Sequence, residues 1–171
     1  MHKKYKYIFN LPKKYLRILI VTLLILGVFF RFTNLEQKPY WGDESLTSQR
    51  ISGYTDQDFQ AIVLQGEEMK VVEIQDYQRP NPQRGLLDAI NALVKHGEHP
   101  PLYYLMARFW MQLFQNIVTT PRSLSAVISL VAMPCIYSLC WELFESSLVG
   151  WIAMGLLAIS PLQILYAQEA R

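Results

Sequence analysis

The sequence has few of the residues that build disulfide frameworks or metal centres. Among its 171 residues there are only 2 cysteines and 3 histidines, and charged residues make up 18%. Cys135 and Cys140 lie in one apolar block, at a spacing that turns them away from each other on a helix. We therefore interpret them as small apolar core residues and expect neither a disulfide nor a zinc site from them.

Acidic residues are missing from the first part of the chain, since none precedes Glu36. Basic residues are frequent there. They are Lys3, Lys4, Lys6, Lys13, Lys14 and Arg17. Short basic flanks of an apolar segment stay on the cytoplasmic side of a membrane. We therefore expect a cytoplasmic N-terminus, which places Asp43 on the outer side.

Charge is also scarce in three long apolar blocks. The block 16–32 carries charge only at Arg17 and Arg31, and the blocks 123–141 and 148–167 carry none. A helix needs about 17–25 apolar residues to cross the hydrocarbon core of a bilayer. The three blocks therefore predict three transmembrane helices and a mainly α-helical, polytopic membrane protein.

The first block has two interpretations. Its basic start and short apolar centre are typical of a signal peptide. The segment RFTNLEQ that follows shows no small-residue cleavage pattern. We therefore expect a retained transmembrane helix.

The polar stretch between the first two blocks contains several local patterns. We expect a helix from Asp43 to about Gln65 that is interrupted at Gly53, with both acids of WGDES in its first turn. Val71–Tyr77 predicts a weak strand or an extended piece, and the prolines of residues 79–83 predict a turn or loop. Gly85–Lys95 has the apolar periodicity of a short amphipathic helix.

Residues 101–117 are aromatic and apolar but contain Arg108. Placing an arginine at mid-membrane costs roughly 2.5–3.5 kcal/mol. Pro100 and Pro101 suit a helix start, and tyrosine and tryptophan favour the membrane interface. We expect an interfacial helix here, which gives three spans. The alternative is a fourth span, with the chain end in the cytoplasm.

These patterns divide the chain into seven segments. They are a basic cytoplasmic tail (1–15), a span (16–32), an extracytoplasmic loop with the acids and the interfacial helix (33–122), a span (123–141), a short cytoplasmic loop (142–147), a span (148–167) and the start of a second outer loop (168–171).

Asp43 and Glu44 are the first candidates for chemistry. The simpler interpretation is a solvated helix start, where acids suit the helix dipole. A carboxylate at a membrane surface can also act as a general base or hold a divalent cation such as Mg²⁺ or Mn²⁺. Adjacent residues on a helix point about 100° apart, so we expect different roles for the two acids.

Further polar and aromatic residues lie near the predicted outer surface. Each has an ordinary role as a helix flank or interface anchor, and each can also contact a lipid phosphate or a sugar. They are Arg31, His99, Tyr103, Arg122, Glu169 and Arg171.

The ordered set of WGDES, HPPLYY, PRSLSA and ISPLQILYAQEAR resembles the dolichyl-phosphate-mannose-protein mannosyltransferase-like family of membrane glycosyltransferases, which have the GT-C fold. The resemblance runs from about Arg31 to Arg171. It implies transfer of a hexose such as mannose from a polyprenyl- or dolichyl-phosphate carrier to a glycan, lipid or protein acceptor outside the cytoplasm. It implies a catalytic Asp43. It also matches His99 to the HPPL element of the family, and Arg122 to the arginine that opens the next span.

The resemblance also implies that neither a nucleotide sugar nor a nucleic acid is a partner, in keeping with the missing glycine-rich nucleotide loop. Members of the family are several times longer, so we expect an N-terminal part of a longer enzyme, and the activity of this chain alone stays open. Two other interpretations stay open as well. The first is a non-catalytic membrane subunit, or a degenerate relative of the family, that acts through helix–helix contacts. The second is a part of a transporter.

Overall fold

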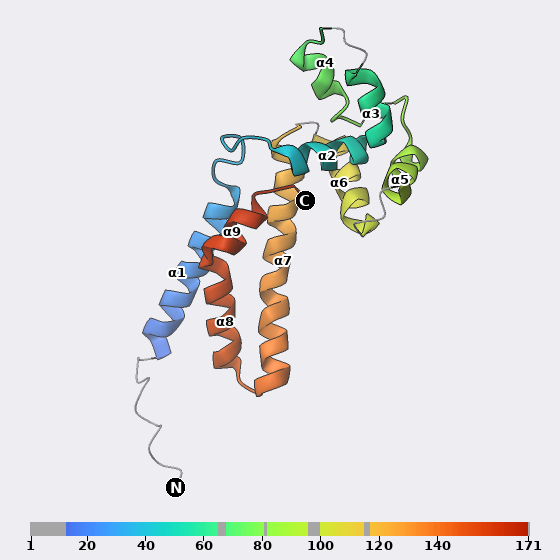
Figure 1. Cartoon of the computed structure of the whole chain (residues 1–171). Helices are drawn as coiled ribbons and strands as arrows, with labels where there is room; N and C mark the ends of the chain where they lie inside the picture. Colours follow the sequence, from blue (N-terminus) through green and yellow to red (C-terminus); the bar gives the residue numbers. More distant parts are fainter. Residues whose placement is uncertain (1–12, 65–67, 81, 96–99, 115–116, 171) are drawn as a thin grey trace. The chain divides into compact units, whose positions relative to one another are not determined.

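The computed structural model describes residues 13–64, 68–80, 82–95, 100–114 and 117–170. Its regular structure in these residues is α-helical, which confirms the predicted class. The helices are α1 (Lys13–Phe32), α2 (Gly42–Ser52), α3 (Asp56–Val63), α4 (Val71–Asp76), α5 (Leu86–Lys95), α6 (Pro101–Phe114), α7 (Thr119–Phe144), α8 (Ser147–Ile159) and α9 (Pro161–Ala167) (Figure 1).

The chain divides into two compact units. The first unit comprises residues up to Thr33 together with Ile128–Tyr166, and the second comprises Asn34–Val127 together with Ala167–Arg171. The first unit therefore contains most of the long apolar helices. The second contains the short helices that follow the first apolar block.

Within the residues that the structure describes, two helices are long and apolar enough to cross a membrane. They are α1 over Lys14–Phe32 and α7, which extends over 26 residues and so exceeds the predicted range 123–141 at both ends. The third predicted span, 148–167, is not one straight helix. It is divided into α8 and α9, which meet at a 61° bend and form a third candidate span only if they are taken together.

α1 and α8 lie side by side in the first unit (Figure 1). Gly27 allows this close approach, because a Cβ atom there would lie 2.5 Å from the carbonyl oxygen of Ala158. Met133, Met154 and Ala158 form a small buried cluster beside this contact. The outward faces of these helices are rich in exposed apolar side chains, as expected for helices surrounded by lipid.

Pro161 explains the bend between α8 and α9. Proline has no N–H, so it cannot donate to the carbonyl four residues earlier, which belongs to Leu157. Arg31 of α1 supplies replacement donors. Its Nη2 donates to Leu157 O at 3.1 Å, and its Nη1 donates to Ala158 O at 2.6 Å and to Gly27 O at 2.9 Å.

The second unit has its own core, formed where α2 and α5 pack against α6. The buried residues of this core are Ile51, Leu93, Tyr104, Ala107, Met111 and Leu124. Gly53 follows α2 with a positive φ of 91°, so the predicted interruption at this residue is confirmed. The helix predicted around 85–95 is also confirmed as α5.

α6 begins at Pro101 as predicted and has 14 residues. That length corresponds to about 21 Å, which is short of the roughly 30 Å of a bilayer core. Arg108 of α6 is buried, and its Nη1 and Nη2 donate to the carbonyls of Ile51 and Arg84 at 2.6 and 2.5 Å. Desolvation on burial lowers the pKa of Arg108. Over its described residues α6 is therefore too short to be a span by itself, and its position at the membrane interface stays a prediction.

The predicted strand at Val71–Tyr77 is wrong, because this segment forms α4. The backbone N–H of Lys70 donates to the Glu73 carboxylate at 3.2 Å, a bond that stabilises the start of a helix. This local cap outweighs the β-propensity of the two valines. Of the predicted turn over 79–83, Asn81 lies outside the described residues.

Candidate functional site

The candidate site is built on the first turn of α2. The chain is extended at Trp41 and becomes helical at Gly42, which places Asp43 and Glu44 in the first turn as predicted. Their negative charge is favourable beside the free N–H groups of a helix start. The two carboxylates differ in environment, because Asp43 is exposed and Glu44 is fully buried.

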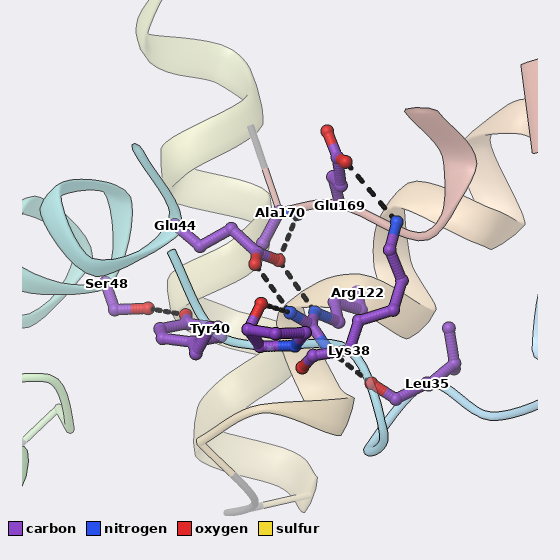
Figure 2. A network of polar contacts seen from close by, with 9 residues as sticks. Leu35, Lys38, Tyr40, Glu44, Ser48, Arg122, Glu169 and Ala170 are labelled. Atoms are coloured by element: carbon purple, nitrogen blue, oxygen red, sulfur yellow. Dashed lines mark hydrogen bonds and ion pairs between the residues drawn. The ribbon is translucent and has the colours of Figure 1, made fainter. Parts of the chain in front are cut away.

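Glu44 forms a bidentate ion pair with Arg122, which lies in the first turns of α7. The Nε of Arg122 donates to Glu44 Oε1 at 2.7 Å, and its Nη2 donates to Oε2 at 2.6 Å. Both side chains are fully buried. Figure 2 shows the two groups facing each other at the centre of a polar network.

All five N–H donors of Arg122 are engaged in this network. Besides the two bonds to Glu44, Nη1 donates to Leu35 O at 2.5 Å and to Lys38 O at 3.1 Å, and Nη2 donates to Pro39 O at 3.0 Å. A guanidinium has five N–H groups, so none is left for another ligand. In this structure Arg122 therefore holds the loop 35–39 and α2 in place.

The network also includes the chain after α9. The backbone N–H of Ala170 donates to Glu44 Oε1 at 3.0 Å, and Lys38 Nζ lies 3.3 Å from Glu169 Oε1. Figure 2 shows both contacts beside the central pair. The chain after α9 thus contacts both Glu44 of α2 and Lys38 of the loop before it.

Tyr40 covers one side of the pair. The guanidinium carbon of Arg122 lies over the Tyr40 ring, 5.3 Å from the ring centroid. The Tyr40 hydroxyl forms a short hydrogen bond with Ser48 (Figure 2). Burial raises the pKa of Tyr40 far above its ordinary value of 10.0. The phenol therefore stays neutral, and it shields the ion pair from solvent.

Tyr103 of α6 is directed toward α7 within the second unit. Its hydroxyl lies 2.8 Å from Ser125 Oγ, and its ring makes an edge contact with Tyr104 at 5.8 Å between centroids. Burial raises the pKa of Tyr103 to about 12, and the negative charge of Glu44 contributes to the shift. These contacts leave Tyr103 partly buried beside the network.

The structure brings together only part of the predicted set. Glu44, Arg122 and Glu169 share one network, with Asp43 beside it in the sequence. Arg31 belongs to the first unit, where it binds carbonyl groups and the Ser129 hydroxyl, 2.9 Å from its Nε. His99 and Arg171 lie outside the described residues.

Sequence reasoning missed the contributions of Lys38, Tyr40 and Ser48. Lys38 and Tyr40 precede α2, where a lysine and a tyrosine are ordinary surface residues. Ser48 is buried because it lies one turn after Glu44, on the same face of α2. That helical spacing is the one signal that could have marked it.

Glu44 does not fit a divalent cation, whereas a cation held by Asp43 stays a prediction. Both oxygens of Glu44 accept bonds from Arg122, and Oε1 also accepts the Ala170 N–H. The charge of this carboxylate is thus already balanced. Within the described part of the chain, no group of three or more His, Cys, Asp and Glu side chains could hold a metal ion.

Chemically, the site offers one exposed carboxylate, that of Asp43, next to one that is fixed in an ion pair. An exposed carboxylate can accept a proton from a bound hydroxyl, and a rigid support improves its positioning.

Comparisons with protein-family models, curated proteins and solved structures give no match for this chain.

Proposed function

We propose that the chain belongs to a multi-pass membrane glycosyltransferase. It would transfer a hexose such as mannose from a polyprenyl- or dolichyl-phosphate carrier to a glycan, lipid or protein acceptor of the cell envelope. The proposed location is the plasma (inner) membrane, with the N-terminus in the cytoplasm and the site on the outer side. The proposed architecture is a GT-C-like module in which α8 and α9 together count as the third span.

The observation that carries the proposal is the separation of the two adjacent acids. Glu44 is buried and paired with Arg122, whereas Asp43 is exposed in the same helical turn. This division fits a base that is positioned by a rigid neighbour. The two apolar helices support the lipid environment that a polyprenyl carrier requires.

In the proposed reaction, Asp43 accepts the proton of the acceptor hydroxyl. The acceptor oxygen forms a bond to the anomeric carbon from the side opposite the phosphate. The bond between that carbon and the phosphate oxygen breaks, and its electron pair leaves with the polyprenyl phosphate. The products are the glycosylated acceptor with inverted configuration, the lipid phosphate and the proton on Asp43. No step passes through a metal ion.

The test is transfer by Asp43→Asn in membranes that contain the complete protein. We expect a loss of roughly 10²- to 10⁴-fold in transfer from polyprenyl-phosphate mannose, because a general base contributes about that much. The control is Asp76→Asn, which neutralises an exposed acid at the end of α4. Transfer that persists in Asp43→Asn would remove the assigned base. Absence of transfer in the unmodified protein would favour the non-catalytic subunit instead.

A further inference from the structure

Arg50 is a buried arginine that does not take part in the polar network around Glu44. It lies in the last turn of α2 and is 7% exposed. Among the described residues its Nε has no hydrogen-bond partner, and the ion pairs that the structure describes do not include it. A buried polar atom without a partner calls for a water, an ion or a ligand.

The other buried arginines of the second unit show the contrast. Arg108 donates to two carbonyls, and Arg122 uses every donor it has. A cation near a helix C-terminus is favourable because of the helix dipole, which accounts for an arginine in the last turn of α2. The dipole does not account for burial of the Nε without a partner. A buried guanidinium needs acceptors for its N–H groups, as Arg108 and Arg122 have and the Nε of Arg50 has not.

Arg50 lies on the same side of α2 as Asp43. The two residues are seven positions apart, which is close to two full helical turns and about 10 Å along the axis. Side chains on a helix lean toward its N-terminus, and Asp43 lies in that direction from Arg50. An anion bound by Arg50 is thus placed on the face that carries the exposed acid.

Two uncharged neighbours have buried atoms without partners as well. They are the Oε1 of Gln49 and the Oγ of Ser52, again among the described residues. These residues are three positions apart and share an adjacent face of α2. They supply polar groups for water or hydroxyls but no charge. Of these three residues, Arg50 is the one that carries a charge.

The phosphate of the proposed lipid donor needs a cation in the second unit. Arg122 has no N–H left for it, because its five donors hold Glu44 and three carbonyls. A guanidinium binds phosphate oxygens through paired N–H groups. We propose that Arg50 binds the phosphate of the polyprenyl-phosphate donor, an inference that rests on the proposed function.

The test is equilibrium binding to the complete protein in phosphatidylcholine nanodiscs. The probes are a polyprenyl monophosphate, the matching polyprenol without phosphate, and inorganic phosphate. We expect Arg50→Gln to weaken binding of the lipid phosphate by roughly 10- to 100-fold, the contribution of hydrogen bonds to a charged group. Polyprenol binding should not change. Arg79→Gln is the matched control, because Arg79 is an exposed arginine of the same unit.

Equal binding of the lipid phosphate by the unmodified protein and Arg50→Gln would overturn the inference. Binding of inorganic phosphate as tight as that of the lipid would overturn the assignment to a lipid donor. If Arg50→Gln does not fold, the same binding measurement is made with Arg50→Lys. Lysine keeps the charge but not the paired donors, so we expect several-fold weaker binding, and unchanged binding would count against the proposal.

A separate variant distinguishes this inference from the proposed function. Asp43→Asn should bind the lipid phosphate as the unmodified protein does, while losing transfer. If transfer depends on Asp43 but phosphate binding does not depend on Arg50, only the inference fails. If the unmodified protein does not prefer the lipid phosphate to polyprenol, the proposed function fails together with the inference.

Discussion

Glu44 and Arg122 are 78 positions apart in the sequence, yet their side chains form a fully buried, two-bond ion pair. The desolvation cost of such a pair is large and is offset only when geometry and further hydrogen bonds are good. Here three carbonyls and the Ala170 N–H supply those bonds. The pair therefore fixes the loop before α2, the first turn of α2 and the start of α7 against one another.

Removal of one partner should destabilise the second unit strongly. We expect Glu44→Ala to lower the free energy of unfolding by about 3–5 kcal/mol, because Arg122 is left as an uncompensated buried charge. Denaturant unfolding in detergent micelles, monitored for the second unit, measures this loss. The double variant Glu44→Ala with Arg122→Met should lose less than the sum of its two single variants, because it leaves no unpaired buried charge. Strictly additive losses in the double variant would contradict the pairing.

The pair between Lys38 and Glu169 provides an internal comparison. Its side chains are 29% and 12% exposed, and the two atoms lie 3.3 Å apart. Partly exposed ion pairs contribute at most about 1 kcal/mol. Lys38→Met should therefore lower stability far less than Glu44→Ala. A loss as large as that of Glu44→Ala would show that the network depends on Lys38 rather than on the buried pair.

Much of the fold follows from local patterns in the sequence. Apolar blocks predicted the positions of α1 and α7, and Gly53 predicted the end of α2. The predictions failed where one residue changes a longer pattern. Pro161 divides an apolar block that is long enough for one span, and Glu73 turns a valine-rich segment into a helix.

The site was predictable only as a set of candidates. The sequence placed Asp43 and Glu44 in one helical turn, and helical geometry indicated different roles for them. The partner of Glu44 was not predictable, since no spacing rule links residues 44 and 122. Arg50 gave no signal, because an arginine in the last turn of a polar helix is common. Its burial depends on packing between distant segments.

The start of α3 should respond to acidic pH. Asp58 Oδ2 accepts the backbone N–H of Thr55 at 2.9 Å and its hydroxyl at 2.8 Å. The backbone bond is the main cause that lowers the pKa of Asp58 from its ordinary value of 3.8. Because the folded-state pKa is the lower one, this stabilisation is present above the unfolded pKa and is lost as the pH falls through the folded pKa.

We therefore expect amide hydrogen exchange in α3 to accelerate, relative to its intrinsic rate, as the pH is lowered from about 5 toward about 2. Asp58→Asn should reduce this dependence, and Thr55→Ala should cost about 0.5–2 kcal/mol as the loss of a cap. Asp76→Asn is the control. If acid accelerates exchange in α3 as much in Asp58→Asn as in the unmodified chain, the bonds between Thr55 and Asp58 are not the cause.

Gly27 and Gly155 offer a matched pair of substitutions at the contact of α1 with α8. A Cβ atom at Gly27 would lie 2.5 Å from the backbone oxygen of Ala158, so Gly27→Ala must force the helices apart. We expect a loss of about 1–3 kcal/mol from this overpacking. At Gly155 a Cβ atom would lie 3.7 Å from the nearest atom, in Leu23.

Gly155→Ala should therefore be neutral or stabilising by up to about 1 kcal/mol, the helix-propensity gain of alanine over glycine. Thermal unfolding of both variants in the same detergent tests the contrast. Equal stabilities of the two variants would show that α1 and α8 are not held at the distance described.

The contact of Arg31 with the end of α8 leads to the last prediction. Arg31 donates to Leu157 O at 3.1 Å and to Ala158 O at 2.6 Å, and Pro161 cannot donate to Leu157. In an apolar surrounding a carbonyl without a donor is costly. Arg31→Leu should therefore destabilise the first unit by about 1–3 kcal/mol for each carbonyl that loses its donor.

A double-variant cycle with Pro161→Ala tests this mechanism. Alanine restores an N–H at position 161 and lets the helix continue, so Leu157 O no longer needs Arg31. The cost of Arg31→Leu should then be smaller in the Pro161→Ala background than in the unmodified chain, and the 61° bend should decrease. Thr22→Val is the control, because it alters an exposed position of α1 outside this contact and should leave stability unchanged. An equal cost of Arg31→Leu in both backgrounds would mean that Arg31 stabilises α8 by packing, and not by satisfying the carbonyl that proline leaves free.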